Sequence, residues 1–222
     1  MRKPDEKLKA QRREQLIAVA SELFAMKNYH EVLMDEVAVR AGIAKGTVYN
    51  YFPTKEDLYK SIITERLESL LRLLQDRIDN RHTPLTNIRR IVVHMYSFMA
   101  KYSHFFQIWY KEKLNCSRSP HEHFHKLYQE IKNLMIIALE RGIKEDILRP
   151  HAAPFVADIA IGIIDSAVLR SENLTAEERK LERVRVYEFI LDALGTDLAH
   201  QLHRDGQDEP QKEEGSVIVA EK

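Results

Sequence analysis

The chain has 222 residues, of which 44% are hydrophobic and 31% charged, a composition typical of a folded globular protein. Basic and acidic residues balance at 34 each, so no overall basic charge indicates a nucleic-acid partner. The longest apolar run, Leu134 to Leu139, is six residues, far short of the roughly 20 that cross a membrane. The single cysteine, Cys116, excludes an internal disulfide and a multi-cysteine zinc site. With no signal peptide at the start of the sequence, we expect a cytoplasmic protein without membrane contact.

Glycine and proline are scarce, with seven of each in the chain, too few for the many turns of a β-sandwich or barrel. Apolar residues recur instead at helical spacing. Helix-start patterns occur at Thr54, Ser119 and Thr175, each followed three residues later by an acidic residue. We therefore predict an all-α chain with nine helices. They are expected at 6–27, 34–41, 45–52, 55–80, 85–101, 104–114, 120–142, 152–171 and 176–200.

The second and third expected helices are short and joined by a tight turn. Gly42 between them permits a left-handed conformation that other residues disfavour. Val48 and Phe52 place an apolar side on the third helix. Two helices of about eight residues joined in this way form a helix-turn-helix. Neither is long enough to be stable alone, so the long first helix must pack across both.

The outward side of the third helix carries a cation, hydroxyl groups and an amide, and it has no carboxylate. The residues on this side are Lys45, Gly46, Thr47, Tyr49, Asn50 and Tyr51. These groups suit hydrogen bonds to phosphate oxygens and base edges, which predicts contact with DNA.

The sequence GIAKGTVYNYFPTKEDLY, with the preceding DEVAVRAG, resembles the signature of the TetR family of transcriptional regulators. The resemblance covers roughly residues 10–60. It implies a nine-helix TetR-like fold, with a three-helix DNA-binding head at 1–54 and a ligand-binding and dimerisation domain at 55–203. Family members commonly have Ser or Thr where Leu33 stands, and often Ser where Ala44 stands. Two helix caps are therefore missing, at about 1 kcal/mol each.

Position by position, the resemblance implies that Lys45, Thr47 and Asn50 face the DNA groove. Gly46 would let the helix approach closely. A solvated lysine is the structural alternative for Lys45.

The hydroxyls of Tyr49 and Tyr51 would bind phosphates, and Lys55 would bind the flanking DNA backbone. A packed aromatic pair is the alternative for the two tyrosines, and a solvated side chain is the alternative for Lys55. The basic segment 2–13 is expected either to reach adjacent DNA phosphates or to be an ordinary solvated terminus.

Aromatic side chains concentrate in the middle of the chain. The resemblance implies that they line a small-molecule cavity, whereas core packing alone is the alternative. Because no acidic or basic residue stands out among them, we expect a mostly apolar ligand. The residues expected to line the cavity are Phe98, Tyr102, Phe106, Trp109, Tyr110, Phe124 and Tyr128.

The helix expected at 152–171 is apolar nearly all round, so it must be buried on two sides. One side carries Phe155, Ile159 and Ile163, and another carries Val156, Ala160, Ile164 and Val168. We predict a homodimer held by this helix and the one at 176–200, and we expect a charge at Ile161 or Ile164 to disrupt it. Burial within one chain is the alternative.

His121, Glu122 and His125 match the H-E-x-x-H pattern of zinc proteases, but they lie in the first turn of a helix, where the dipole opposes a cation. Ordinary histidines are the better interpretation, while a sensory role for His121, His125 or Cys116 stays open. We expect no catalytic residues, no metal and no cofactor.

The sequence predicts a ligand-responsive DNA-binding transcriptional regulator. We expect a repressor that a small-molecule effector releases from a palindromic operator in double-stranded DNA. Residues 204–222 carry six acidic and three basic side chains and are expected to form a disordered acidic tail. A helical metalloenzyme and a helical interaction protein are the competing classes.

Overall fold

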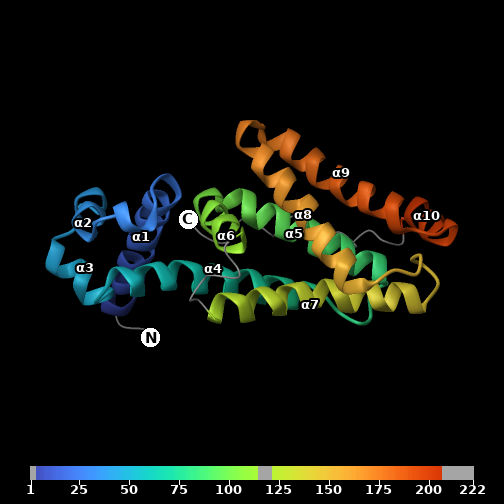
Figure 1. Cartoon of the computed structure of the whole chain (residues 1–222), viewed down its shortest axis with the longest axis horizontal. Helices are drawn as coiled ribbons and strands as arrows, with labels where there is room; N and C mark the ends of the chain where they lie inside the picture. The colour runs from blue at the N-terminus through green and yellow to red at the C-terminus, as the bar shows by residue number, and fades with distance from the viewer. Residues whose placement is uncertain (1–3, 115–121, 207–222) are drawn as a thin grey trace. The chain divides into compact units, whose positions relative to one another are not determined.

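The computed structural model of the protein describes residues 4–114 and 122–206, and these residues are almost entirely helical (Figure 1). The helices are α1 (Pro4–Met26), α2 (Met34–Ala41), α3 (Lys45–Tyr51), α4 (Lys55–Arg77), α5 (Pro84–Lys101), α6 (Ser103–Leu114), α7 (Glu122–Lys144), α8 (Ala153–Arg170), α9 (Ala176–Leu194) and α10 (Asp197–Arg204), with the 3₁₀ turns η1 (Tyr29–Glu31) and η2 (Ser171–Asn173). The all-α prediction is confirmed. Across the described residues, no helix has both the length and the apolar character needed to cross a membrane.

The last predicted helix is wrong, because the described chain has ten α-helices and the segment 176–200 is divided into α9 and α10. Gly195 is extended, with φ −70° and ψ 147°, and the Thr196 side chain accepts a hydrogen bond from the Ala199 amide at the start of α10. Apolar spacing continues through both helices, so the hydrophobic pattern alone did not reveal the break.

The break is stabilised by the connection between α7 and α8. The Arg149 amide donates to the Leu194 carbonyl at 2.9 Å, and the Thr196 amide donates to the Ile147 carbonyl at 3.0 Å. These bonds form an antiparallel bridge between Leu148 and Gly195. We call this pairing the clasp. Tertiary hydrogen bonds therefore interrupt the helix at a residue with low helix propensity.

The chain divides into two compact units, each with its own core. The first unit holds the chain up to Ser69 together with Tyr102–Leu127, and the second holds Leu70–Lys101 together with the chain from Tyr128. Both α4 and α7 contribute residues to both units. In the first unit, α1 packs against α2 and α6, and α2 packs against α3.

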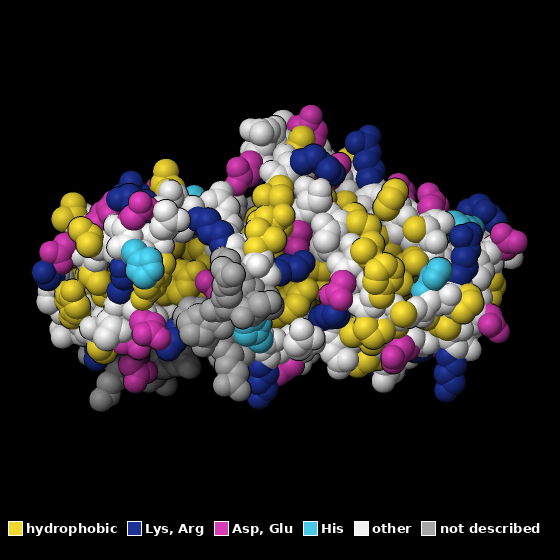
Figure 2. All heavy atoms as spheres, viewed as in Figure 1, with side chains coloured by type: hydrophobic (Ala, Val, Ile, Leu, Met, Phe, Trp, Pro, Cys, Tyr) yellow, Lys and Arg dark blue, Asp and Glu magenta, His cyan; other side chains and the backbone are white. Residues whose placement is uncertain are grey.

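In the second unit, α5 packs against both α8 and α9, which also contact each other. The α5 helix is buried over most of its length, including Ile91, Met95 and Met99. Figure 2 shows hydrophobic side chains that stay at the surface around α8 and α9. The second unit therefore has a buried core and exposed apolar side chains around α8 and α9.

Candidate nucleic-acid interface and ligand pockets

The turn between α2 and α3 has the geometry that the sequence predicts. Gly42 adopts a left-handed conformation, with φ 64° and ψ 31°. A Cβ at Gly42 would meet no atom within 4 Å, so the backbone angle alone requires glycine. The Gln15 side chain of α1 donates to the Ala41 carbonyl at 2.9 Å, which ties the first helix to the end of α2. Val48 of α3 is fully buried.

The opposite side of α3 is open to solvent. Lys45, Gly46, Tyr49 and Asn50 are exposed, whereas Thr47 and Tyr51 are half-buried. The Tyr49 side chain is 39% exposed. Neither tyrosine ring stacks on another ring among the described residues.

The Lys45 ammonium forms an ion pair with Asp35 of α2, at 2.8 Å between Nζ and Oδ1. The hydrogen bond and charge of Asp35 raise the pKa of Lys45 above its usual value. Lys45 is therefore not an unpaired solvated lysine. Its cation stays at the surface, where an incoming anion can compete with the carboxylate.

Lys55, in the first turn of α4, is bound to the turn η1. Its ammonium donates to the carbonyls of Tyr29 at 2.9 Å, Val32 at 3.1 Å and His30 at 3.4 Å. It also lies 4.6 Å from the centre of the Tyr29 ring. Sequence reasoning missed this role, because the carbonyls belong to a turn that lies 23 to 26 residues earlier.

The helix starts show which caps are present. Leu33 and Ala44 give no side-chain hydrogen bond to α2 or α3, as expected from their apolar side chains. Thr54 and Asp57 form the predicted reciprocal pair at the start of α4, with the Asp57 amide donating to the Thr54 hydroxyl at 3.0 Å and the Thr54 amide to the Asp57 carboxylate at 3.1 Å. The start of α4 is thus fixed more firmly than the starts of the two short helices.

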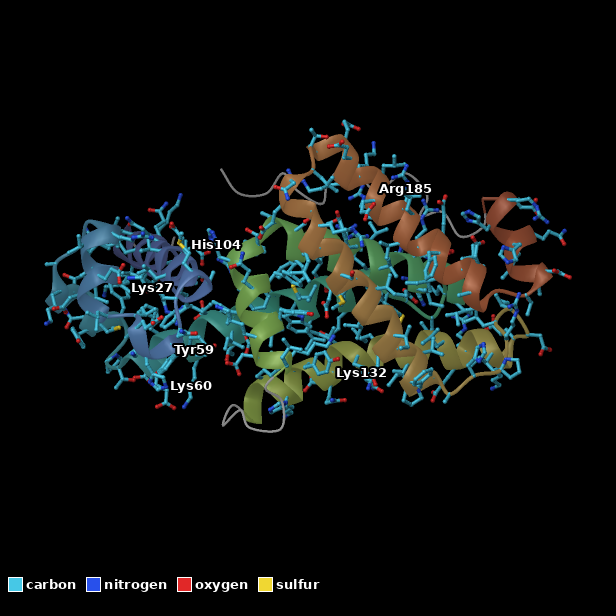
Figure 3. All side chains as sticks on the ribbon, turned by 45° about the horizontal axis from the view of Figure 1, so that its top comes forward. Lys27, Tyr59, Lys60, His104, Lys132 and Arg185 are labelled. Carbon is cyan, nitrogen blue, oxygen red and sulfur yellow. The ribbon has the colours of Figure 1, made fainter. Side chains whose placement is uncertain are left out.

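An aromatic cluster joins the head to α6 within the first unit. The Tyr59 ring lies 4.9 Å from Phe24 and 5.1 Å from Tyr29, measured between centroids. The Tyr59 hydroxyl, labelled in Figure 3, donates to the Glu112 carboxylate of α6 at 2.7 Å. Burial and this bond raise the pKa of Tyr59, which therefore stays protonated. Lys111 of α6 donates to the Ala25 carbonyl at 2.9 Å.

Part of the predicted basic arm belongs to the fold. Arg13 forms an ion pair with Glu65, and its guanidinium carbon lies 5.0 Å from the centre of the Phe52 ring. Residues 1–3 of the arm lie outside the described residues, as do residues 207–222 of the predicted tail.

The residues predicted to line the effector cavity divide between the units. Phe98 and Tyr128 lie in the second unit, and the remaining five lie in the first. Trp109 and Phe124 are almost fully buried, with ring centroids 5.8 Å apart. The Phe106 and Tyr110 rings lie 6.0 Å apart. These rings pack on one another, and an effector cavity among them stays a prediction.

An apolar groove of about 280 Å³ lies on α8 and α9. Its lining includes Phe155, Ile159 and Phe189, which are 65%, 50% and 62% exposed. Ile161 and Ile164 are instead buried inside the protomer, at 1% and 0% exposure. A charge at either isoleucine would therefore disrupt folding, and the expectation that they test a dimer interface is wrong.

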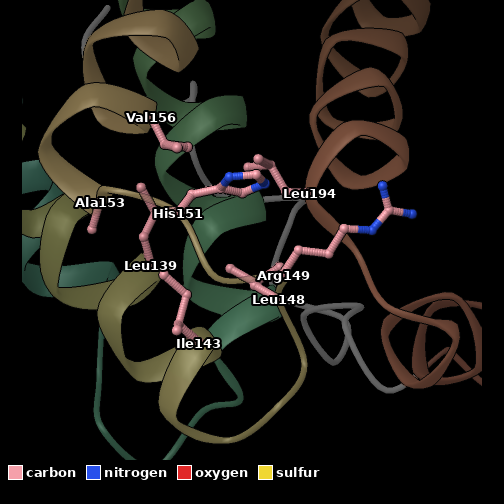
Figure 4. Close-up of a pocket in the computed structure, with 8 residues that line it drawn as sticks. All are labelled: Leu139, Ile143, Leu148, Arg149, His151, Ala153, Val156 and Leu194. Carbon is pink, nitrogen blue, oxygen red and sulfur yellow. The ribbon is translucent and has the colours of Figure 1, made fainter.

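Two further hollows lie in the second unit. A cavity of about 10 Å³ (Figure 4), lined by Leu139, Ile143 and Leu148 among others, has space for about one water molecule. A larger pocket of about 330 Å³ lies between α5 and α9 and is lined by several basic side chains. Sequence reasoning missed it, because α9 interleaves these cations with glutamates in the pattern of a solvated surface.

The histidine pattern falls largely outside the described structure. Cys116 and His121 are not among the described residues, and the side chains of Glu122 and His123 are not described either. The His125 ring lies 5.5 Å from that of Phe124. In the part of the chain that the structure describes, no three His, Cys, Asp or Glu residues are grouped to hold a metal ion.

Comparison with known proteins gives matches over the head and over most of the chain. A family model described as bacterial regulatory proteins of the tetR family matches residues 16–62. The HTH-type transcriptional regulator LuxR of Vibrio harveyi is 25% identical over 184 residues, covering 79% of this chain and 86% of the relative. The HTH-type transcriptional repressor KstR2 of Mycobacterium tuberculosis is 25% identical over 142 residues, covering 63% of this chain and 70% of that protein.

Solved structures share the fold. The ketosteroid transcriptional regulator KstR2 of Mycobacterium tuberculosis superimposes with a TM-score of 0.74 at 17% identity, covering 84% of this chain and 96% of that one. FadR of Bacillus subtilis, solved in complex with stearoyl-CoA, gives a TM-score of 0.62 at 21% identity, covering 81% and 95%. The helical arrangement is therefore found in proteins of diverged sequence.

Proposed function

Because the chain belongs to the TetR family of transcriptional regulators, we propose that it represses transcription by binding a palindromic operator in double-stranded DNA as a homodimer. The observation that carries this proposal is the solvent-facing side of α3, which presents donors and acceptors without a carboxylate on a glycine-turned helix-turn-helix. The proposed role of the protein is regulatory rather than catalytic, and the protein acts in the cytoplasm. Residues 1–54 form the DNA-binding domain and 55–203 the ligand-binding and dimerisation domain.

We propose that α3 enters the major groove and that its exposed amide reads a base. Asn50 pairs with an adenine edge through two hydrogen bonds, whereas Lys45 and Thr47 contact the groove walls. A Cβ at Gly46 would meet no atom of the protein within 4 Å. Packing within the protein therefore does not require glycine at this position, and the absence of a side chain supports close approach of α3 to DNA.

The tyrosine hydroxyls are proposed to bind phosphates, which fixes the position of the head without reading sequence. Tyr49 is exposed and Tyr51 half-exposed, in keeping with this role. For Lys55 we propose a positioning role in place of a direct phosphate contact, because its ammonium is bound by the carbonyls of η1.

We propose that the apolar groove on α8 and α9 is covered by the same groove of a second copy. Large apolar side chains exposed together on a protein surface mark interaction sites. A second copy is favoured because a palindromic operator requires two heads related by a two-fold axis. Phe155, Ile159 and Phe189 are the proposed centre of this interface.

A small-molecule effector is proposed to release the operator. Two solved structures of the same fold were determined in complex with small molecules, stearoyl-CoA for FadR and choline for a regulator of Saccharomonospora viridis. The aromatic residues grouped around Trp109 are the proposed apolar part of the effector site. By linkage, an effector that weakens operator binding is itself bound more weakly by the operator complex.

The test of the DNA-reading face compares two asparagine variants. Operator fragments are selected from random DNA, and affinities are measured by fluorescence anisotropy for operators with single base-pair changes. Asn50→Ala should lose about 1–3 kcal/mol of discrimination at one base pair in each half-site. Asn133→Ala, an exposed asparagine of α7, should bind like the native protein. Unchanged discrimination in Asn50→Ala would show that α3 does not read the sequence through this residue.

A further inference from the structure

The pocket between α5 and α9, here called the basic pocket, is concave and positively charged. Its volume is about 330 Å³, within the range of about 300–1,000 Å³ found for small-molecule sites. The polar and charged side chains that line it are Tyr96, Ser97, Lys101, Arg179, Lys180 and Arg183, and no carboxylate lines it. The small side chains of Ala100 and Ala176 leave space between the cations.

The cations of α9 in the basic pocket are not neutralised by ion pairs. Across residues 4–114 and 122–206, the side chains of Arg179 and Lys180 have no ion-pair or hydrogen-bond partner. The nearby Glu182 is bound to Arg170 at 2.7 Å and does not line the pocket. Like charges held together without a counter-charge repel one another, so this arrangement favours binding of an anion.

Arg183 is held in a fixed position by α5. One terminal nitrogen of its guanidinium donates to the Ser97 hydroxyl at 3.1 Å. Its Nε is buried without a hydrogen-bond partner. Arg183 also lines the pocket, so its terminal N–H groups are the donors offered to an anion.

Arginine side chains of α4, α5 and α9 act electrostatically on His94 of α5. His94 is almost completely buried, and its pKa is lowered to about 4, first by burial and then by the charges of Arg77, Arg90 and Arg183. The Arg90 guanidinium donates to the Arg77 carbonyl at 2.7 Å. This side of α5 therefore contributes positive potential.

We propose that the basic pocket binds the phosphate groups of an anionic ligand. Arginine donors match pairs of phosphate oxygens in geometry, and phosphate carries more negative charge than a single carboxylate. A ligand of this pocket would carry a phosphate group, in contrast to the mostly apolar molecule expected from the sequence. As a statement about the effector, this inference rests on the proposed regulatory function, whereas phosphate binding itself is measured without DNA.

Two probes separate the possible sources of the phosphate. The full-length protein is titrated by calorimetry with inorganic pyrophosphate and with coenzyme A, which carries a diphosphate on an organic scaffold. We expect both to bind and to compete with each other. Competition in which coenzyme A binds more tightly supports an organic phosphate ligand, and binding of pyrophosphate alone supports a free phosphate ligand. Failure of both probes to bind at millimolar concentration would overturn the proposal.

The variants test whether the pocket is responsible. Arg183→Gln should weaken binding at least tenfold, whereas Arg185→Gln, an exposed position of α9 labelled in Figure 3 that does not line the pocket, should change it less than twofold. The pair Arg179→Gln and Lys180→Gln tests the pocket while leaving the Ser97 bond intact, and should also weaken binding at least tenfold. If the Arg183 and Arg185 variants lose probe affinity equally, the proposal is overturned, because the loss would then come from the lower overall charge of the protein and not from the pocket.

Operator affinity without probe should be unchanged in all these variants. Variants that lose probe binding but still bind the operator support the proposed phosphate site. If the native protein binds no operator, the proposed regulatory function is contradicted, but the measured phosphate binding still holds. The two failures are thereby distinguished.

Discussion

The ammonium of Lys45 and the carboxylate of Asp35 form an ion pair across the glycine turn, with 2.8 Å between nitrogen and oxygen. The first residue of α3 is thus paired with a residue of α2, and both side chains remain more than half exposed. A DNA phosphate that reaches Lys45 must compete with Asp35, and it also meets the negative charge of that carboxylate. In the proposed role of Lys45, its contribution to DNA binding is therefore the difference between two ion pairs.

Replacing the carboxylate should accordingly strengthen DNA binding. We expect Asp35→Asn to raise operator affinity at low salt, by at most about fivefold, because an exposed ion pair contributes little. Anisotropy titrations at several salt concentrations measure the effect. Asp192→Asn removes an exposed carboxylate from α9 and should leave affinity unchanged. Weaker binding by Asp35→Asn would show that the pair orders the head.

Lys55 should act through stability. Lys55→Met keeps the alkyl chain but removes the ammonium from three carbonyls, and it should lower the free energy of unfolding by about 2 kcal/mol. Lys60→Met, on the exposed side of α4, should cost much less. Urea unfolding measures both.

The salt dependence of operator binding distinguishes the two roles of Lys55. A positioning residue leaves the slope of log K against log salt unchanged, whereas loss of a phosphate contact reduces the slope by about 0.9 per head. A reduced slope in Lys55→Met would restore the direct contact implied by the family resemblance.

The dimer should depend on the exposed side of α8 and α9. Phe155→Glu and Phe189→Glu place a charge in the proposed apolar interface and should weaken the dimer more than 100-fold, because an unpaired buried charge costs several kcal/mol. Sedimentation equilibrium measures this, and circular dichroism should show native helix content. Ile137→Glu, at an exposed isoleucine of α7, is the control. A Phe189→Glu protein that stays dimeric at micromolar concentration would place the interface elsewhere.

Stability should fall in acid because of His94. Its pKa is lowered from 6.5 to about 4 in the folded protein, so between these values the unfolded chain binds the proton more readily. The free energy of unfolding should therefore decrease as the pH falls through this range, by at most about 3 kcal/mol. Chemical denaturation at pH 7 and pH 4.5 should show the decrease, and His94→Gln should reduce it. His104→Gln, which replaces an exposed histidine, should leave the decrease in stability unchanged.

Features that depend on neighbouring residues could be predicted from the sequence. The left-handed turn at Gly42 and the caps at Thr54 and Thr175 each arise within four residues, and all three form as expected. The break at Gly195 could not be predicted, because the bonds that stabilise it come from the connection at 147–149.

The candidate sites depend on residues far apart in the chain. A helix that is apolar all round does not reveal which side faces its own core, so Ile161 was taken for an interface residue although Ile159 is the exposed one. The bonds of Lys55 to η1, and the meeting of Ser97 with Arg183, require tertiary structure. Local chemistry pointed to α3 as the candidate DNA-binding helix, whereas three-dimensional packing was needed to find the basic pocket.

The clasp between Leu148 and Gly195 joins the two ends of the segment that contains α8 and α9, so that this segment forms a closed ring. Because both ends of this ring are joined by backbone bonds, the clasp fixes the ends of α8 and α9 next to the groove against each other. His151 and Leu194, next to it, line that groove. Insertions or deletions in the connection after α7 would therefore shift one wall of the groove against the other. In the proposed dimer, such a change during divergence would alter which subunits assemble together while leaving every contact residue in place.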